Sequence, residues 1–575
     1  MFRTALQKCV DEGIFPDRWK RQKLVLLPKP GKQPGDPSAY RPICLLDTVG
    51  KLLERLILNR LNKYTEHEYG LSNMQFGFRK GRSTVDAIRK VIETAGKVNT
   101  QRKGGNRYCA VVTLDVKNAF NSASWKAIAG SLHDLRVPEY LCRILKSYFQ
   151  NRMLIYETEE DQRRIVITAG VPQGSILGPT LWNGMYNGVL KLKLPRGVEI
   201  IGFADDIVLL VTGETREVVE VLATEAVSTV ENWMHEKKLA IAHHKTEVSL
   251  ISNCRIVQQA KLVVGECIIK SKRAVKYLGV MVDDRLNFNS HIDYACERAA
   301  KASKALARIM PNNSAISGTK RRLLASVSAS ILRYGGPAWI SALKTKKNQS
   351  KLNSSFRLTS LRVASAYRTV SMEAACVIAG MMPICIVLEE DSMCYNQRGT
   401  KGIRKTERAN SMTRWQHEWN NTTKGRWTHR LIPNVSAWMD RGHGEVNFHL
   451  TQFLSGHGCF RKYLHRFGHA RSADCPECAG NEETPEHVVF VCPRFESARN
   501  AMIRVSGADT TPDNVVQRMC RDDSTWSVVS EVITQIMTAL QQKWRSDQQV
   551  DGTARPPNST SVPRELPTSG NPLPE

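Results

Sequence analysis

The chain has 575 residues, too many for one compact hydrophobic core, so we expect three or four structural units. Its 82 Lys and Arg residues outnumber 55 Asp and Glu residues and give a formal net charge of +27, which is costly unless a polyanion is bound. Nucleic acid is therefore the expected partner, with a merely basic protein as the alternative, and a membrane partner is disfavoured because neither an apolar run of about 18 residues nor a basic amphipathic anchor is seen.

Residues 1–290 alternate strand and helix patterns. Short β-rich apolar runs predict strands and amphipathic periodicity predicts helices. Ser83, with Asp86 three residues later, resembles a capping box at the start of one helix. Alternation around a hairpin-like centre predicts an α+β fold rather than a doubly wound sheet. The predicted strands are 25–27, 110–114, 165–168 and 207–211, and the predicted helices are 48–65, 84–98 and 217–236.

The second half of the chain divides by composition. The tail is rich in Pro, Ser, Thr and Asn and cannot bury enough apolar surface to fold. Most of the fifteen cysteines stand singly in apolar segments, which is typical of reduced thiols in an intracellular protein. We expect an α+β domain at 1–290, a helical domain at 291–385, a basic, tryptophan-rich linker region at 386–470, a Cys/His unit at 471–500, an amphipathic helix within 501–545 and a disordered tail at 546–575.

Three aspartates stand at the ends of predicted strands. Asp205 and Asp206 separate two apolar runs, and Asp115 ends another run about ninety residues earlier. An isolated pair would be an ordinary turn, because adjacent strand side chains point to opposite faces and only a turn brings both acids to one site. Three carboxylates at strand ends match what two divalent cations about 3.5–4 Å apart require, and hard oxygen ligands favour Mg²⁺.

A loop punctuated by Pro and Gly lies between these aspartates in the sequence. It runs from Gly170 to Pro179 and contains Gln173 and Gly174. Taken alone, it predicts a turn before a helix. Its place between the aspartates predicts backbone that approaches a flat partner such as a base pair, so the loop is a candidate template and nucleotide contact.

The order of these motifs resembles the palm of reverse transcriptases, and most closely that of insect non-LTR retrotransposons in the jockey-like group. The resemblance covers residues 15–285 and, more weakly, the chain to about 500. It implies a right-hand polymerase with fingers, an antiparallel palm sheet, a helical thumb and a C-terminal zinc-knuckle-like unit. The palm motifs are 115–120, 171–175, 203–206 and 277–280, and the fingers motifs and the segment after them are 27–32, 40–43, 75–79 and 81–84.

The resemblance implies roles at the reaction centre. Asp115, Asp205 and Asp206 would be the catalytic aspartates that hold two Mg²⁺ ions, with Asp115 and Asp205 as the more direct ligands. Phe120 would exclude a ribose 2′-hydroxyl and so select deoxynucleotides, with a core aromatic as the alternative. Lys245 would protonate the pyrophosphate leaving group.

The resemblance also implies contacts to the substrates. Lys29 and Arg41 would contact the triphosphate through their positive charge, with a solvated surface charge as the alternative. Gln173 and Gly174 would contact the nucleotide and template. Residues 277–280 would form a primer grip through the shape of their backbone.

Four residues near the C-terminus have the spacing C-x2-C-x8-H-x4-C: Cys475, Cys478, His487 and Cys492. Three thiolates and an imidazole complete a closed tetrahedral Zn²⁺ site of the structural kind, with chance cysteines as the alternative. The pattern resembles the Cys-Cys-His-Cys motif of non-LTR retrotransposon proteins.

Aromatic and basic residues alternate just before this group, from Cys459 to Phe467, which suits stacking on RNA bases together with phosphate contacts. Trp415 and Trp419 stand four apart on a predicted helix. For these tryptophans a packed hydrophobic stripe explains the spacing as well as RNA binding does.

Together these features predict an RNA-directed DNA polymerase of a non-LTR retrotransposon, which extends a primed DNA 3′ end on element RNA by two-metal phosphoryl transfer. Template RNA, primer DNA and deoxynucleoside triphosphates are the expected partners, in an intracellular ribonucleoprotein of nucleus and cytoplasm. A catalytically inactive or domesticated RNA-binding protein is the alternative, and a group II intron maturase or telomerase is disfavoured by the Cys/His unit. The family usually carries an N-terminal endonuclease, which we expect this chain to lack.

Overall fold

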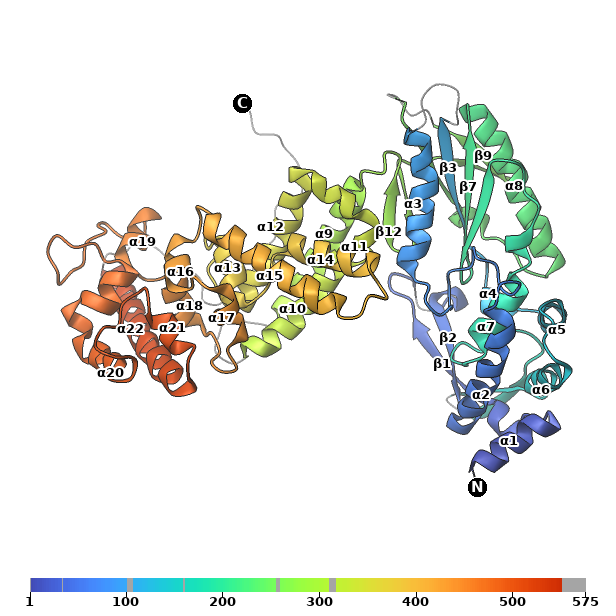
Figure 1. Ribbon diagram of the computed structural model, residues 1–575, viewed down its shortest axis with the longest axis horizontal. Helices are drawn as coiled ribbons and strands as arrows, with labels where there is room; N and C mark the ends of the chain where they lie inside the picture. The colour runs from blue at the N-terminus through green and yellow to red at the C-terminus, as the bar shows by residue number, and fades with distance from the viewer. Residues whose placement is uncertain are drawn as a thin grey trace. The chain divides into compact units, whose positions relative to one another are not determined.

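The computed structural model describes residues 2–33, 35–100, 107–158, 161–254, 259–309 and 317–550. The described residues fall into two compact units, which divide between residues 291 and 292 (Figure 1). The first unit mixes strands and helices, and the second is helical. The predicted α+β class is therefore confirmed. The finer division of the chain into six segments stays a prediction.

The first unit is built on a four-stranded antiparallel sheet, here called the central sheet, with the strand order β6-β7-β3-β8. Its strands are β3 (Tyr108–Leu114), β6 (Val198–Phe203), β7 (Asp206–Gly213) and β8 (Glu247–Ser252). The run from Ile207 to Val211 is fully buried, because helices α3 (Thr84–Thr100) and α8 (Arg216–Glu236) pack on the sheet (Figure 1). The strands predicted at 110–114 and 207–211 are confirmed.

A second sheet, here called the N-terminal sheet, has the strand order β2-β1-β4-β5. Strands β1 (Arg21–Pro28) and β2 (Tyr40–Leu46) form an antiparallel pair, and β4 (Met153–Glu157) joins β1 in parallel. The last strand, β5, spans Gln162–Val166, so the strand predicted at 165–168 begins earlier and ends sooner than expected. Helix α2 (Thr48–Thr65) has the predicted bounds and begins where the carboxylate of Asp47 accepts from the amides of Val49 and Gly50.

Local capping explains where α3 begins. The carboxylate of Asp86 accepts from the Ser83 amide at 2.8 Å, and Ser83 Oγ accepts from the Asp86 amide at 3.3 Å. The predicted capping box is therefore confirmed. The other elements of this unit are α1 (Phe2–Glu12), α4 (Ala119–Ser122), α5 (Trp125–Asp134), α6 (Glu139–Phe149), α7 (Gly178–Tyr186), β9 (Lys261–Val264), β10 (Cys267–Lys270), β11 (Ala274–Tyr277) and β12 (Val280–Asp283).

The second unit is helical. Among its described residues the only β pairing is an isolated bridge between Asp474 and Glu482. The predicted C-terminal helix is present as α22 (Asp523–Val550). The tail predicted at 546–575 was placed too early, because α22 continues through residue 550, and the rest of that tail lies outside the described residues. The larger helices before it are α9 (Asn289–Ala307), α10 (Gly318–Arg333), α12 (Lys346–Val363), α13 (Met372–Ala379), α14 (Ile384–Asn396), α15 (Ile403–Asn421), α16 (Arg426–Leu431), α17 (Val435–Asp440), α18 (Phe448–Ser455), α19 (Arg461–Arg466) and α20 (Glu496–Ser506).

The tryptophan-rich region 386–470 is packed into this unit. Trp415, Trp419 and Trp438 are each at most 2% exposed, and Trp419 Nε1 donates to the Ile432 carbonyl at 2.8 Å. The packed stripe therefore explains the spacing of Trp415 and Trp419. In the described part of the chain no single helix is long and apolar enough to cross a membrane; α13 and α14, bent by 64°, reach that length and composition only as a pair.

Candidate active site and candidate metal centre

The three aspartates meet at one end of the central sheet. Strands β6 and β7 are joined by the two-residue turn Ala204–Asp205, with Phe203 paired to Asp206. On the other side of β7, Leu114 pairs with Ile207, so the next step of the register brings Asp115 opposite Asp206. A turn and a strand register thus place at one site carboxylates that stand about ninety residues apart.

The pKa values of these aspartates reflect both their burial and their closeness to one another. Displacement of water by the surrounding protein, followed by the charges of Asp205 and Asp115, raises the pKa of Asp206 to about 7. The side chain nevertheless keeps contact with solvent. Loss of water also raises the pKa of Asp205, and the Asp115 carboxylate adds to the shift. Divalent cations would relieve this repulsion, so the donor set fits Mg²⁺.

The aspartates do not converge on a single point. Among the residues that the structure describes, only the Cys/His group brings three or more ligand atoms within 4.8 Å of one another.

Two aromatic donors hold the turn that carries Asp205. Trp182 Nε1 donates to the carbonyl of Ala204 at 3.1 Å, and the Tyr186 hydroxyl donates to the carbonyl of Asp205 at 3.0 Å. Both residues are fully buried on α7. Burial, followed by the charges of Asp205, Asp206 and Asp115, holds the pKa of Tyr186 well above its usual range, so its hydroxyl stays a donor.

Lys245 lies at the same end of the sheet, in a short 3-10 helix before β8. Its Nζ donates to Asp115 Oδ2 at 2.8 Å. The backbone fixes this approach, because Val116 bridges Ile241 and the Ala242 amide donates to the Asp115 carbonyl at 2.8 Å. The structure therefore places Lys245 beside Asp115, and its role as a proton donor stays a prediction.

The loop with Gln173 and Gly174 contacts both the N-terminal sheet and Phe120. The Cys44 amide donates to the Gln173 carbonyl at 2.8 Å, and a Cβ on Gly174 would lie 2.5 Å from the Cys44 carbonyl oxygen. The amide of Val171 donates to the Phe120 carbonyl at 2.8 Å. Gly174 also has a φ of 126°, so both space and backbone conformation require glycine.

Phe120 is half-buried on α4 beside Trp182 and Phe78, with ring centroids 5.2 Å and 6.0 Å away. Lys29 and Arg41 lie together elsewhere, on the β1–β2 hairpin, where Leu27 pairs with Arg41 and the Lys29 amide donates to the Ala39 carbonyl at 2.7 Å. Arg41 belongs to β2 of the N-terminal sheet, and Lys29 directly follows β1. The loop at Gln173 links that sheet to α7.

One residue that holds this loop was not anticipated. Glu54, on the buried face of α2, accepts from the amides of Ile176 and Leu177 at 2.5 Å and 3.1 Å. Burial raises its pKa, while the two amides act against that rise. The signal was present in the sequence, since Glu54 interrupts an apolar helix face that contains Leu53, Ile57 and Leu61.

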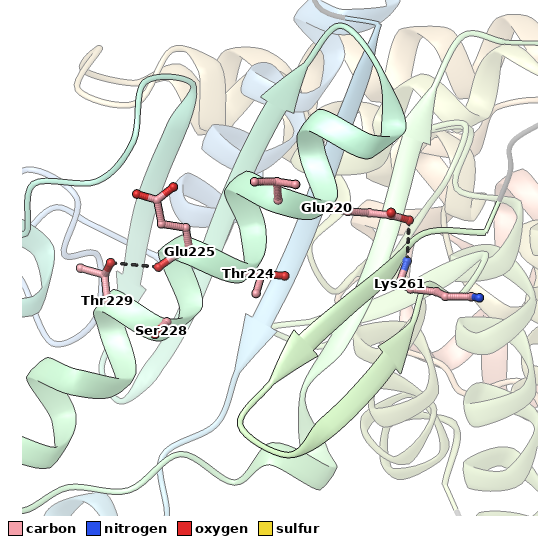
Figure 2. Close-up of a pocket in the computed structure, with 7 residues that line it drawn as sticks. Glu220, Thr224, Glu225, Ser228, Thr229 and Lys261 are labelled. Carbon is pink, nitrogen blue, oxygen red and sulfur yellow. Dashed lines mark hydrogen bonds between the residues drawn. The ribbon is translucent and has the colours of Figure 1, made fainter.

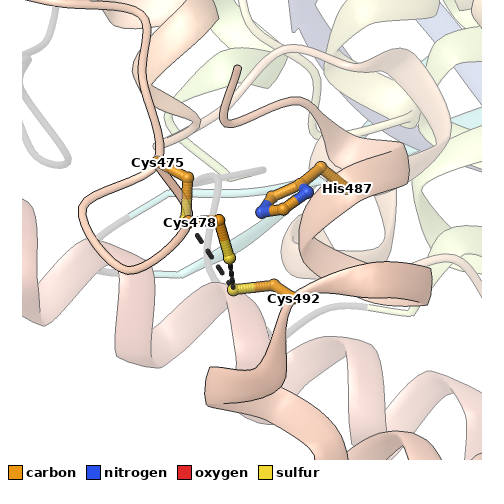
Figure 3. A group of neighbouring side chains, drawn as sticks. All are labelled: Cys475, Cys478, His487 and Cys492. Carbon is orange, nitrogen blue, oxygen red and sulfur yellow. Dashed lines mark hydrogen bonds between the residues drawn. The ribbon is translucent and has the colours of Figure 1, made fainter. Parts of the chain in front are cut away.

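The four predicted zinc ligands come together in the second unit, where Figure 3 shows all four side chains turned toward one point. The Sγ atom of Cys492 lies 3.8 Å from that of Cys475 and 4.0 Å from that of Cys478. The loop that begins at Cys475 and contains Cys478 closes through a hydrogen bond of 2.8 Å from the Cys475 amide to the Asn481 carbonyl. His487 begins a short π-helix, and Cys492 follows its last residue.

The atoms of this group fit a zinc ion. Nε2 of His487 is buried and has no hydrogen-bond partner within the described residues. Burial also lowers the pKa of His487, which keeps the imidazole in its neutral, metal-binding form. Loss of water and the two neighbouring thiols raise the pKa of Cys478 to about 11, a rise that a bound cation would reverse.

Arg494 and Glu483 surround the thiols of this group. Arg494 Nε donates to Cys492 Sγ at 3.4 Å, and its Nη2 donates to Cys475 Sγ at 3.5 Å and also to the Glu483 carboxylate. Glu483 is only 2% exposed. A buried carboxylate thus orients an arginine whose charge faces two sulfurs.

The segment from Cys459 to Phe467 is mixed in exposure. Phe460 is fully buried, Tyr463 is half-buried and Phe467 is 42% exposed. Tyr463 and His457 share the hydroxyl of Thr369, at 2.7 Å and 2.8 Å. Phe460 therefore belongs to the core. RNA stacking on this segment stays a prediction, and Phe467 is the aromatic residue of the segment that is exposed enough to stack on a base.

A surface hollow of about 570 Å³ lies between α8 and β9 (Figure 2). Its contacts attach the edge strand to the helix, because the Lys261 amide donates to Glu220 Oε1 at 2.8 Å and the Val263 amide donates to Thr224 Oγ1 at 3.4 Å. None of the site residues predicted from the sequence lines it. We therefore interpret the hollow as the junction of α8 with β9.

Residues 27–282 match the model of the family described as reverse transcriptase (RNA-dependent DNA polymerase). The chain is 30% identical over 520 residues to a putative 115 kDa protein in type-1 retrotransposable element R1DM of Drosophila melanogaster, which covers 86% of this chain and 50% of that protein. It is also 30% identical over 349 residues to a probable RNA-directed DNA polymerase from transposon BS of the same species, covering 58% of this chain and 37% of that protein.

A third relative is the RNA-directed DNA polymerase from mobile element jockey of Drosophila melanogaster, which is 28% identical over 353 residues, covering 60% of this chain and 38% of that protein. The chain spans about half the length or less of these three relatives. Among solved structures, telomerase from Candida tropicalis bound to a telomeric RNA fragment aligns over 71% of this chain and 67% of that chain, at 11% identity and a TM-score of 0.37.

Proposed function

We propose that this chain is an RNA-directed DNA polymerase, because residues 27–282 match the reverse transcriptase model and the chain is similar to insect retrotransposon proteins. It would extend a primed DNA 3′ end along element RNA with deoxynucleoside triphosphates. The observation that carries the proposal is the strand register that pairs Leu114 with Ile207, since Asp115 follows Leu114, Asp206 precedes Ile207 and Asp205 lies in the adjoining turn.

In this mechanism the oxygens of Asp115, Asp205 and Asp206 hold two Mg²⁺ ions. When bound, the ions lower the pKa of the primer 3′-hydroxyl and stabilise negative charge on the phosphate and on the leaving pyrophosphate. The aspartates contribute by being fixed before substrate arrives, since the turn and the sheet register already set their positions. Preorganised charge of this kind is usually the largest part of the rate enhancement in such sites.

Other residues would position the nucleotide and move a proton. Lys245, beside Asp115, would donate a proton to pyrophosphate as it leaves. Phe120 would place its ring against the sugar and exclude a 2′-hydroxyl. Lys29 and Arg41 would contact the triphosphate, and the loop at Gln173 and Gly174 would contact the base pair. The support for a common site is that Cys44, on the same strand as Arg41, donates its amide to the Gln173 carbonyl.

We also propose that Cys475, Cys478, His487 and Cys492 hold one structural Zn²⁺. The support is the convergence of their four ligand atoms within 4.8 Å. Such a site has no open position for substrate, so its contribution is to the stability of the second unit.

Primer extension on poly(rA)/oligo(dT) by the purified full chain tests the polymerase proposal. Mg²⁺-dependent incorporation of dTTP is expected from the native protein and is expected to fall at least 1,000-fold in Asp205→Ala. Asp161→Ala is the matched control, because this exposed aspartate lies in the turn before β5 and not at the central sheet. Native incorporation no greater than that of Asp205→Ala would sink the proposal.

A further inference from the structure

The turn that carries Asp205 has a backbone conformation that its residues do not prefer. Ala204 has a φ of 59°, in the left-handed region. A residue with a Cβ occupies this region only where the surrounding structure holds it there. The orientation of both adjacent aspartates depends on that turn, so whatever holds Ala204 also aims Asp205 and Asp206.

Gln75 contacts both backbone polar groups of Ala204, although 129 residues separate them in sequence. Its Oε1 accepts from the Ala204 amide at 3.1 Å, and its Nε2 donates to the Ala204 carbonyl at 3.4 Å. The side chain is only 1% exposed. A carboxamide is suited to this task because it offers an acceptor and a donor on one planar group.

The backbone around Gln75 is joined to the edge of the central sheet. Gln75 forms a parallel bridge with Gly202, through hydrogen bonds of 2.9 Å from the Phe76 amide to the Gly202 carbonyl and from the Gly202 amide to the Met74 carbonyl. These bonds fix Gln75 beside the end of β6, directly before the turn. The side chain therefore reaches Ala204 from a rigid base.

Gly77 provides an independent sign that this approach is close. A Cβ at Gly77 would lie 2.1 Å from the Ala204 amide nitrogen, so only glycine fits. The Gly77 amide donates to Gln75 Oε1 at 2.9 Å, and its carbonyl accepts from Asn183 Nδ2 at 2.9 Å. The segment is thus held against the turn from both sides.

We propose that Gln75 is the positioning residue of the aspartate turn: it holds Ala204 in its left-handed conformation and thereby fixes Asp205 and Asp206 for catalysis. The inference rests on the proposed polymerase function. It gives segment 74–77 a defined role in catalysis without contact to substrate. Trp182 and Tyr186 assist from α7, each through one carbonyl of the same turn.

The test compares Gln75→Met, which keeps the length but loses the hydrogen bonds, with Gln75→Glu, which keeps an oxygen to accept from the amides of Ala204 and Gly77. Gln452→Met is the matched control, because Gln452 is equally buried, lies in the other unit, and has an amide without a partner within the described residues. Steady-state kinetics give kcat and KM, Mg²⁺ titration gives the half-saturating concentration, and hydrogen exchange follows the backbone amides of 203–206.

We expect Gln75→Met to lower kcat at least 10-fold, with KM for dTTP within 3-fold, and to raise the half-saturating Mg²⁺ concentration. Exchange at 203–206 should accelerate in Gln75→Met and not in Gln452→Met, and Gln75→Glu should recover part of kcat. Should Gln75→Met fail to fold, Tyr186→Phe carries the same test on a smaller scale, because it removes only the bond to the Asp205 carbonyl.

A kcat within 2-fold of Gln452→Met, together with native exchange at 203–206, would overturn the inference. Inactive native protein with accelerated exchange in Gln75→Met would instead count against the polymerase proposal and leave the role of Gln75 in the turn supported. The two failures are therefore distinguishable.

Discussion

Lys245 Nζ lies 2.8 Å from Asp115 Oδ2, although the two residues are 130 positions apart. The approach is set by backbone on both sides, through the bridge of Val116 with Ile241 and the hydrogen bond from Ala242 to the Asp115 carbonyl. The lysine is thus held at a carboxylate proposed to bind metal, and the pair remains open to solvent.

Replacing Lys245 separates its catalytic role from its structural one. Lys245→Met should lower kcat about 100-fold, as expected for loss of a proton donor, and leave KM for dTTP nearly unchanged. The free energy of unfolding should change by less than about 1 kcal/mol, because exposed ion pairs contribute little. Rapid-quench incorporation and urea unfolding measure the two quantities.

Lys245→Arg distinguishes charge from proton donation. Arginine keeps the positive charge beside Asp115 but does not give up a proton at ordinary pH. We expect this variant to be as slow as Lys245→Met. Native kcat in Lys245→Arg would show that the charge alone is needed and would contradict the proton-donor role.

The raised pKa of Asp206 predicts how stability depends on pH and Mg²⁺. The folded carboxyl has a pKa of about 7, against about 3.9 when unfolded, so the metal-free folded state binds the extra proton between pH 4 and 7. Its stability should therefore fall as pH rises through that window. Mg²⁺ binds the ionised carboxylates, so at ten times its Kd it should raise Tm by about 3–5 °C at pH 8 and hardly at all at pH 5.

Differential scanning calorimetry of the full chain measures this prediction. Asp206→Asn is the control, because its amide does not titrate: the variant should lose the part of the pH dependence that Asp206 contributes and keep the part that comes from the raised pKa values of Asp205 and Glu54. An equal rise of Tm with Mg²⁺ at pH 5 and pH 8 would show that the ions bind elsewhere.

The aspartates could be predicted from the sequence because each follows or precedes an apolar run of strand length. The contacts between the aspartates could not be predicted, because the register of Leu114 with Ile207 is not encoded in a local pattern. The same holds for the parallel pairing of β1 with β4 in the N-terminal sheet. Such pairings depend on the whole chain packing at once.

The partners of buried polar side chains also could not be predicted from the sequence. Gln75 and Glu54 act through backbone groups more than 100 residues away, and nothing near either residue in sequence names its partner. Trp415 and Trp419 show the converse case. An aromatic stripe at helical spacing has the same pattern whether it covers a core or a nucleic acid, and only the fold shows that it is buried.

Phe120 should control the choice of sugar. Its half-buried ring packs on Trp182 and Phe78, so Phe120→Ala should open space for a 2′-hydroxyl. We expect the preference for dTTP over UTP, measured as the ratio of kcat/KM, to fall about 10–200-fold, the range for one steric contact. Phe120→Tyr keeps the bulk and should keep the preference. A preference unchanged in Phe120→Ala would show that the ring belongs only to the core.

The zinc proposal predicts a role for Arg494. Three thiolates with a neutral imidazole leave the proposed site with net charge −1, and Arg494 donates to two of the sulfurs while Glu483 orients it. Arg494→Met should therefore weaken zinc binding about 10–100-fold, as is typical when a partner of metal ligands is removed.

Arg499→Met is the matched control, because Arg499 donates to the carbonyl of Cys492 and not to its sulfur. Competition with a chromophoric chelator measures the affinities, and the visible spectrum of the Co²⁺-substituted protein reports whether four ligands remain. Equal affinities in the two arginine variants would remove the role of Arg494, whereas native protein that retains no zinc would remove the metal site itself.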